Sequence, residues 1–259
     1  MKTRYLAIIL LVLTGLTLGA CQTKPEGEVT IYYEENAQFE LIGPQGERVL
    51  IDVYDPSLLS APASENDILL TTHGHQDHFN PGFIADFPGE QLFIRSGELS
   101  TGDVSITGIA SAHTAFDSET YPEEGGSNYI YVIEIGGMRI AHLGDIGQEE
   151  LTAEQLEALG EVDIALTQFV NSYSQMDMTN LKGFNLMEQL KPKLIIPTHG
   201  NGNMDAMGHA GELWQAYANP PREITIRQSD FGEGTQFVIV GAGANSMQAI
   251  FGLPFWGEK

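Results

Sequence analysis

Short apolar runs separated by glycine-rich or polar turns dominate the first half of this chain, and their length predicts β-strands. The turns at residues 43–46 and 136–137 are rich in glycine and predict hairpins between the runs beside them. The first three runs therefore predict an antiparallel meander. We expect strands at residues 29–33, 38–42, 48–53, 68–71, 92–94, 104–110, 128–135 and 139–143, with a short helix at 81–87.

The second half alternates such runs with longer segments that favour helices. Thr152 and Gln155 have the spacing of a capping box at the start of a helix that ends near Gly160. Pro192 ends another predicted helix. We expect helices at 152–159, 179–190 and about 208–218, and strands at 163–169, 194–197, 223–227 and 236–240.

Two groups of strands, each followed by helices, predict two sheets packed face to face and covered by helices. The expected fold class is α/β (α+β), a four-layer αββα sandwich of two mixed β-sheets. No repeat of 20–50 residues is visible, so we expect one catalytic domain at residues 28–240. The pattern leaves open whether the tail at 241–259 packs on this domain or is irregular.

The N-terminus has the pattern of an export signal. Basic residues 1–4 precede an apolar run at 5–20, which is too short for a comfortable transmembrane helix. The run ends in Leu-Gly-Ala-Cys21, which resembles the lipobox of bacterial lipoproteins, and Cys21 is the only cysteine. We expect a signal peptide at 1–20, a lipid on Cys21 and a tether at 21–27 in an exported membrane lipoprotein that faces the periplasm or the exterior. The alternatives are an ordinary signal peptide, or an uncleaved anchor, with an unrelated cysteine.

The chain is strongly acidic, with a formal net charge of −23 that becomes −25 once Lys2 and Arg4 are removed with the signal peptide. The remaining Lys and Arg residues are scattered, apart from Lys191 and Lys193. A polyanion requires a basic patch, so nucleic acid is not an expected substrate or partner. The charge otherwise favours solubility.

The most informative segment is Thr-Thr-His-Gly-His-Gln-Asp-His at residues 71–78, directly after a predicted strand. Three of the seven histidines lie here, together with an aspartate. Imidazole and carboxylate groups suit zinc and its first-row neighbours. A strand that ends in this motif can direct His73 and His75 at one ion, and the next turn can direct Asp77 and His78 at a second.

Three further candidate ligands end separate strands. His113 follows the strand at 104–110, Asp145 follows the one at 139–143, and His199 follows the one at 194–197 in Pro-Thr-His-Gly. Functional sites form where the loops at strand ends gather.

The order His-x-His-x-Asp-His, His, Gly-Asp and Pro-Thr-His-Gly resembles the metallo-β-lactamase fold superfamily of metal-dependent hydrolases over residues 28–240. Within it, the pattern is most similar to the branch of L-ascorbate-6-phosphate lactonase. The resemblance implies that His73, His75 and His113 hold one ion, that Asp77, His78 and His199 hold another, and that Asp145 bridges them. The ions would be zinc, or else manganese or iron.

Two ions that share a water can lower its pKa and supply hydroxide for attack on a carbonyl or phosphoryl centre. Asp77 would orient this bridging hydroxide or take up its proton, and is the expected catalytic residue. The expected activity is hydrolysis of a small ester, lactone or phosphodiester. Asp145 argues against β-lactam hydrolysis, because β-lactam-opening members of the superfamily typically lack this aspartate.

Two departures from the sequence pattern of the lactonase branch argue against the lactonase substrate itself. The Gly-Asp-Thr usual in that branch is Gly-Asp-Ile146 here. A phosphate group on the substrate also requires nearby cations, for which Arg95 and Lys182 are the candidates.

Several other residues are candidates for supporting roles. Asp52 is expected to fix a turn or a ligand, and His142 to pack below the site. The loop at 171–178 lies where relatives carry substrate-contacting residues. The candidates for substrate contact are His209, Tyr173, Gln175 and Asp177.

Two other functions stay open at this stage. A phospholipid phosphodiesterase would act near the membrane, with Phe83, Phe87, Phe251 and Trp256 as apolar contacts. A non-catalytic metal-binding lipoprotein would keep the fold without turnover, although the complete ligand set argues against it. The sequence does not reveal the oligomeric state.

Overall fold

The computed structural model describes residues 27–114, 127–199 and 203–258. The predicted signal peptide, Cys21 and nearly all of the tether lie outside the described residues.

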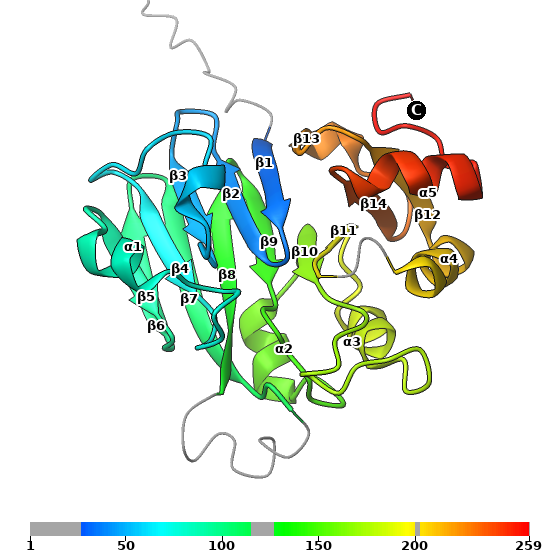
Figure 1. Ribbon diagram of the computed structural model, residues 1–259, viewed down its shortest axis with the longest axis horizontal. Coiled ribbons are helices and arrows are strands. Elements are labelled where there is room, and N and C mark those ends of the chain that lie inside the picture. The colour runs from blue at the N-terminus through cyan, green and yellow to red at the C-terminus, as the bar shows by residue number, and fades with distance from the viewer. Residues whose placement is uncertain (1–26, 115–126, 200–202, 259) are drawn as a thin grey trace, which may run out of the picture.

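Two mixed β-sheets form the centre of the molecule (Figure 1). The first has the strand order β13-β1-β2-β3-β4-β5, with parallel pairs only among β3, β4 and β5. Its strands are β1 (Glu28–Glu35), β2 (Gln38–Ile42), β3 (Arg48–Ile51), β4 (Ile68–Thr71), β5 (Glu90–Phe93) and β13 (Glu223–Arg227).

The second sheet has the order β12-β14-β11-β10-β9-β8-β7-β6. It is parallel from β12 to β9 and antiparallel from β9 to β6. Its strands are β6 (Gly97–Thr101), β7 (Val104–Ser111), β8 (Asn128–Ile135), β9 (Met138–His142), β10 (Ile164–Thr167), β11 (Leu194–Pro197), β12 (Gln215–Asn219) and β14 (Gln236–Val240).

Helices cover the outer faces of both sheets (Figure 1). Phe87, after α1, packs on Leu50 and Leu69 of the first sheet, whereas Phe184 and Ala244 from the later helices join the core on the second sheet. The helices are α1 (Pro81–Asp86), α2 (Ala153–Leu159), α3 (Lys182–Leu190), α4 (Met204–Leu213) and α5 (Gly243–Phe251), with 3-10 turns η1 (Pro56–Leu58) and η3 (Gln228–Asp230).

The largest apolar cluster lies between the sheets. Alternate residues of β1 and β2, including Ile31 and Leu41, meet residues of β8 and β9 such as Tyr131 and Ile140. Burial on this scale supplies the main favourable free energy of folding, about 25 cal/mol per Å² of apolar surface. The predicted αββα sandwich is confirmed.

The structure corrects the prediction of a helix at 208–218. That segment divides into the end of α4 and the edge strand β12, in which Ala216 pairs in parallel with Phe237. Asn203 starts α4 earlier, since its side chain accepts a hydrogen bond from the amide of Ala206 at 3.0 Å. The short side chains of β12 gave no periodicity from which a strand could be predicted.

Two smaller corrections and one open point concern the ends and edges of elements. Strand β6 was not predicted, because most of its residues are exposed and lack a clear apolar alternation. Helix α3 begins later than predicted, because Asp177 folds residues 177–180 into a turn by accepting the amides of Thr179 and Asn180. Within the tail at 241–259, α5 packs against β12 and β14.

No helix of residues 27–114, 127–199 and 203–258 is long and apolar enough to cross a membrane.

Candidate metal centre

The histidine loop leaves the first sheet at the end of β4. This strand is buried and lies in parallel between β3 and β5, so its carboxyl end is fixed on both sides. The loop then turns tightly, with the amide of His78 donating to the carbonyl of His75 at 3.0 Å. The side chains of this loop therefore start from a rigid strand end.

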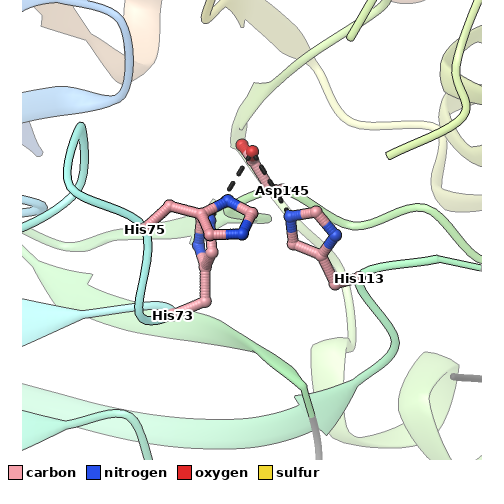
Figure 2. A group of neighbouring side chains, drawn as sticks. All are labelled: His73, His75, His113 and Asp145. Atoms are coloured by element: carbon pink, nitrogen blue, oxygen red, sulfur yellow. Dashed lines mark ion pairs between the residues drawn. The ribbon is translucent and has the colours of Figure 1, made fainter. Parts of the chain in front are cut away.

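The seven candidate ligands lie in two groups. His73, His75, His113 and Asp145 offer ligand atoms that all lie within 4.8 Å of one another. Figure 2 shows the three imidazoles and the carboxylate of this group around one space. Asp77, His78 and His199 form the second group, within the same limit.

The carboxylate of Asp145 lies between the two groups. Its Oδ2 is 3.6 Å from Nε2 of both His73 and His113. Its Oδ1 is 3.4 Å from Nε2 of both His78 and His199. One oxygen thus faces each group.

Several of these atoms lack the partner that buried polar atoms normally have. Nε2 of His73, Nε2 of His113 and Oδ1 of Asp145 are buried without a hydrogen bond. Nitrogen and carboxylate donors converging without partners are the arrangement that a divalent cation satisfies. The residues present therefore fit a metal site, although ligation by each of them stays a prediction.

Asp52 orients His78 from beneath. Its Oδ2 lies 2.8 Å from Nδ1 of His78, and its two oxygens accept the amide and hydroxyl of Thr72, each at 2.8 Å. Nδ1 of His78 is therefore the nitrogen that keeps its proton when the ring is neutral, and Nε2, which lies 3.2 Å from Nε2 of His199, is the nitrogen placed to face an ion. The hydroxyl of Thr72 also lies 3.1 Å from Nδ1 of His73. This contact orients the His73 ring in the same way, with Nδ1 toward Thr72.

The backbone around Asp145 depends on a glycine and a buried amide. Gly144 has φ +56°, and a Cβ there would lie 2.4 Å from Oδ1 of Asn128. That same oxygen accepts the amide of Asp145 at 2.9 Å, while the Asn128 amide group donates to the carbonyl of Leu143. Only glycine allows this close approach, which fixes the start of the Asp145 loop.

Asp145 has a second asparagine partner, on its side chain, that the sequence did not reveal. Nδ2 of Asn171 donates to Oδ2 of Asp145 at 2.8 Å and to Oε1 of Gln168 at 2.7 Å. Ser174 donates to the carbonyl of Asp145 at 2.9 Å. No motif marks Asn128 or Asn171, because both are distant in sequence from Asp145, which they contact. The one available signal was the position of Asn171 at the start of the predicted substrate loop.

Burial and neighbouring charges set the protonation of the ligands. Burial, with the nearby His78, lowers the pKa of His73 to about 3. Desolvation also lowers the pKa values of His75 and His199. These rings are therefore neutral near pH 7, in the state that binds metal.

Asp145 and His78 shift each other's pKa values. Burial by itself raises the pKa of Asp145, but the imidazoles of His113 and His78 outweigh it and hold that pKa well below its usual range. Burial by itself lowers the pKa of His78, but the carboxylates of Asp52 and Asp145 raise it to about 10. Metal binding at His78 must therefore release a proton.

The residues predicted to contact substrate lie in two different places. Tyr173 is 75% exposed, and its ring centroid lies 6.0 Å from that of His75. Asp177 and the backbone of Gln175, which has φ +54°, shape the turn beyond it. His209 instead packs edge-on against Phe184 and lies 3.5 Å from Glu212.

The other sequence candidates have structural contacts. Lys182 is buried and donates to the carbonyl of Gly147 while it pairs with Glu149, so it is not free for a phosphate group. Phe83 and Phe87 stack on each other over the first sheet, and Trp256 packs edge-on against Tyr217. Phe251 is the exposed member of the four aromatic candidates.

The profile of the Beta-lactamase superfamily domain matches residues 30–199 of the chain. Among curated proteins, a UPF0173 metal-dependent hydrolase from Thermococcus onnurineus is 26% identical over 230 residues, which cover 79% of this chain and 94% of the relative. A UPF0173 metal-dependent hydrolase from Methanosarcina mazei is 25% identical over 183 residues, or 60% of this chain and 76% of the relative.

Two solved structures share the fold. A protein from Thermotoga maritima, described as a Zn-dependent hydrolase of the metallo-β-lactamase superfamily, has a TM-score of 0.59 at 22% identity and covers 82% of this chain and 98% of its own. A metallo-β-lactamase fold protein from Bacillus subtilis has a TM-score of 0.54 at 12% identity, over 83% of this chain and 98% of its own.

Proposed function

The chain belongs to the β-lactamase superfamily and is a metal-dependent hydrolase, and on this premise we propose that it works with two divalent ions bridged by Asp145. His73, His75 and His113 would hold one ion, and Asp77, His78 and His199 the other. Zinc suits this nitrogen-rich donor set, and manganese or iron would also be accommodated.

The observation that carries the proposal is the division of the Asp145 carboxylate. Oδ2 faces His73 and His113 at 3.6 Å, and Oδ1 faces His78 and His199 at 3.4 Å. A carboxylate that served one ion would not place its two oxygens toward separate groups of imidazoles.

Two ions held by these residues would lower the pKa of a bound water and would polarise the oxygen of the scissile bond. The chain itself supplies orientation and proton transfer. The carboxylate of Asp77 is exposed beside His78 and His199, where it can orient the attacking water or take up its proton. The amide of Asn171 holds Oδ2 of Asp145 in place during these steps.

We propose a small ester, lactone or phosphodiester as the substrate. The accessible side of the centre carries the exposed residues His75 and Asp77, with Tyr173 above His75. These exposed polar and aromatic groups beside the candidate ligands are suited to contact a small molecule. The lactonase branch stays a prediction, and Lys182, one of its two candidate cations for phosphate, is already paired.

The phospholipid alternative has little support from the aromatic residues. Phe87 is buried on the first sheet, and Phe83 and Trp256 are only partly exposed, because each packs against an apolar cluster of the domain. Hydrolysis of soluble esters, compared with phospholipid vesicles, separates the two activities.

We also propose that the chain is exported and lipid-anchored at Cys21. Expression with a radiolabelled fatty acid should label the wild type and leave Cys21→Ser unlabelled and released from membranes. Equal labelling of both proteins would overturn this assignment.

Metal content per chain is the first test of the dinuclear site. We expect about two equivalents in the wild type, with Asp145→Ala retaining one or none. We also expect hydrolysis in the variant to fall by roughly 100-fold or more, because bridged ions supply several kcal/mol of transition-state stabilisation. Asp103→Ala is the matched control, since Asp103 lies far from the ligands and accepts only the side chain of Gln45 among the described residues.

One equivalent in the wild type, unchanged in Asp145→Ala, would overturn the two-metal mechanism. Two equivalents without turnover on an ester, lactone and phosphodiester panel would favour the metal-binding lipoprotein instead.

A further inference from the structure

His142 is a fully buried histidine outside the two ligand groups, at the end of β9. Both ring nitrogens have backbone partners. Nδ1 accepts the amide of Gly144 at 3.0 Å, and Nε2 lies 3.1 Å from the carbonyl of Ala37. Because an amide can only donate and a carbonyl can only accept, the ring must carry its proton on Nε2.

Each partner of His142 belongs to a different sheet. Gly144 precedes Asp145 in the loop after β9, whereas Ala37 lies in the turn between β1 and β2 of the first sheet. The ring therefore links the loop that carries the bridging carboxylate to a turn of the opposite sheet. Phe39 packs edge-on against the ring, with centroids 5.7 Å apart.

The same turn contacts the other metal group. The carbonyl of Asn36 accepts the amide of His199 at 2.9 Å. His199 has φ +40°, a left-handed conformation that costs free energy for a residue other than glycine and must be held by its surroundings. The turn at residues 35–37 thus holds Asp145 through His142 and holds His199 directly.

We propose that His142 is a positioning residue that sets the orientation of the Asp145 carboxylate between the two metal positions. This role rests on the proposed dinuclear function. Without the ring, the buried amide of Gly144 loses its acceptor, and the Leu143–Gly144 peptide that leads into Asp145 is held by Asn128 alone. A shift of Gly144 would then displace the Asp145 carboxylate, so that its oxygens no longer face their own groups of imidazoles.

Two substitutions separate the two hydrogen bonds of the ring. In His142→Asn, the side-chain oxygen can occupy the place of Nδ1 and still accept from Gly144. In His142→Gln, the side-chain amide can occupy the place of Nε2 and still donate to Ala37, but Gly144 loses its acceptor. Phe39→Leu is the packing control, because it loosens the ring's surroundings and leaves both hydrogen bonds in place.

The readout is titration of metal-free protein with cobalt(II), followed by its visible absorption. In wild type we expect two equivalents with distinct spectra. In His142→Gln we expect the affinity for the second equivalent to fall by about 10-fold or more, as is usual when a group that orients metal ligands is lost. His142→Asn and Phe39→Leu should stay within about threefold of the wild type.

A second measurement needs neither variant nor metal. Nitrogen-15 NMR of the histidine rings in the metal-free wild type should show His142 protonated on Nε2 alone. Protonation on Nδ1 would overturn the inference by itself.

The outcomes also separate the inference from the function on which it rests. Two cobalt equivalents with equal affinity in all four proteins would overturn the role of His142 and leave the dinuclear site intact. A similar loss in His142→Gln and Phe39→Leu would make the effect one of packing and also overturn the role. One equivalent or none in wild type would overturn the dinuclear site and this role with it, whatever tautomer is observed.

Discussion

The two ends of the β-sandwich have similar architecture and different chemistry. At one end, the loops after β4, β7, β9 and β11 bring the seven candidate ligands together. At the other end, the turns after β2 and β8 line a cavity of about 630 Å³ whose walls include Glu47, Asp103, Glu134 and Asp163. The ligand end has histidines and two aspartates, and the cavity end has carboxylates without histidine among its described lining residues.

The carboxylates differ in their partners more than in their number. At the cavity end, Glu134 pairs with Arg139, and Asp163 pairs with Lys193 at 2.7 Å. At the ligand end, Asp145 is buried and faces four imidazole nitrogens. Two of these nitrogens, on His73 and His113, and Oδ1 of Asp145 itself have no hydrogen bond. The comparison shows that unsatisfied, converging donors identify a metal site better than the size of a hollow does.

The largest expected effect is a pH dependence of the unfolding free energy, which only the ligand end confers. In the metal-free protein the pKa of His78 is raised to about 10 from its ordinary value of 6.5, mainly by Asp52 and Asp145 against the effect of burial. Its stabilising contribution is complete below pH 6.5 and is lost as the pH rises through about 10.

Urea unfolding of metal-free wild type and Asp52→Asn across this range measures the contribution. The difference in unfolding free energy should shrink by a few kcal/mol between pH 6.5 and 10, because each pKa unit corresponds to about 1.4 kcal/mol. A difference that is constant with pH would contradict the assignment of the shift to the Asp52–His78 pair.

The next effect is on metal affinity near neutral pH. Asp52→Asn removes the carboxylate that holds the proton on Nδ1 of His78, so Nε2 is no longer fixed toward the ion. We expect a loss of about 10- to 100-fold in affinity for one of the two equivalents, measured by competition with a chelator. Unchanged affinity for both would mean that His78 is oriented without Asp52.

The smallest effect belongs to the cavity end. Glu134→Gln breaks an exposed ion pair while Arg139 keeps its bonds to the carbonyls of Leu159 and Ala158. Thermal or urea unfolding should show a loss of at most about 1 kcal/mol, and metal content and hydrolysis should not change. A substantial loss of activity would show that the two ends are coupled, and would break the comparison.

The sequence predicted which side chains come together at the ligand end, because the signals for this grouping are local. The histidine motif follows a buried strand, and the other ligands follow the apolar runs that became β7, β9 and β11. Parallel strand ends gather at one edge, so their residues could be expected to meet. Asp52 was predicted to support a turn or ligand, and its bond to His78 is of that kind.

The remaining contacts arise from tertiary placement and have no local signal. Asn171 and Asn128 are ordinary amides in sequence, and they contact Asp145 only because separate loops cross it. Strand β12 and helix α5 were missed for a related reason. Small residues such as Ala216 and Ala244 become informative only when β14 lies beside them.

The direction of β1 has a consequence for how an anchored molecule would meet its substrate. Gly27 lies beside Gly136 at the cavity end, and after β1 the chain reaches Asn36 and His199 at the ligand end. An eight-residue strand spans roughly 25 Å, which is longer than the reach of about 20 Å of a six-residue tether between Cys21 and Gly27. If the proposed lipid is present at Cys21, it would thus hold the cavity end toward the bilayer, with the candidate ligands turned outward to meet solutes from the surrounding fluid.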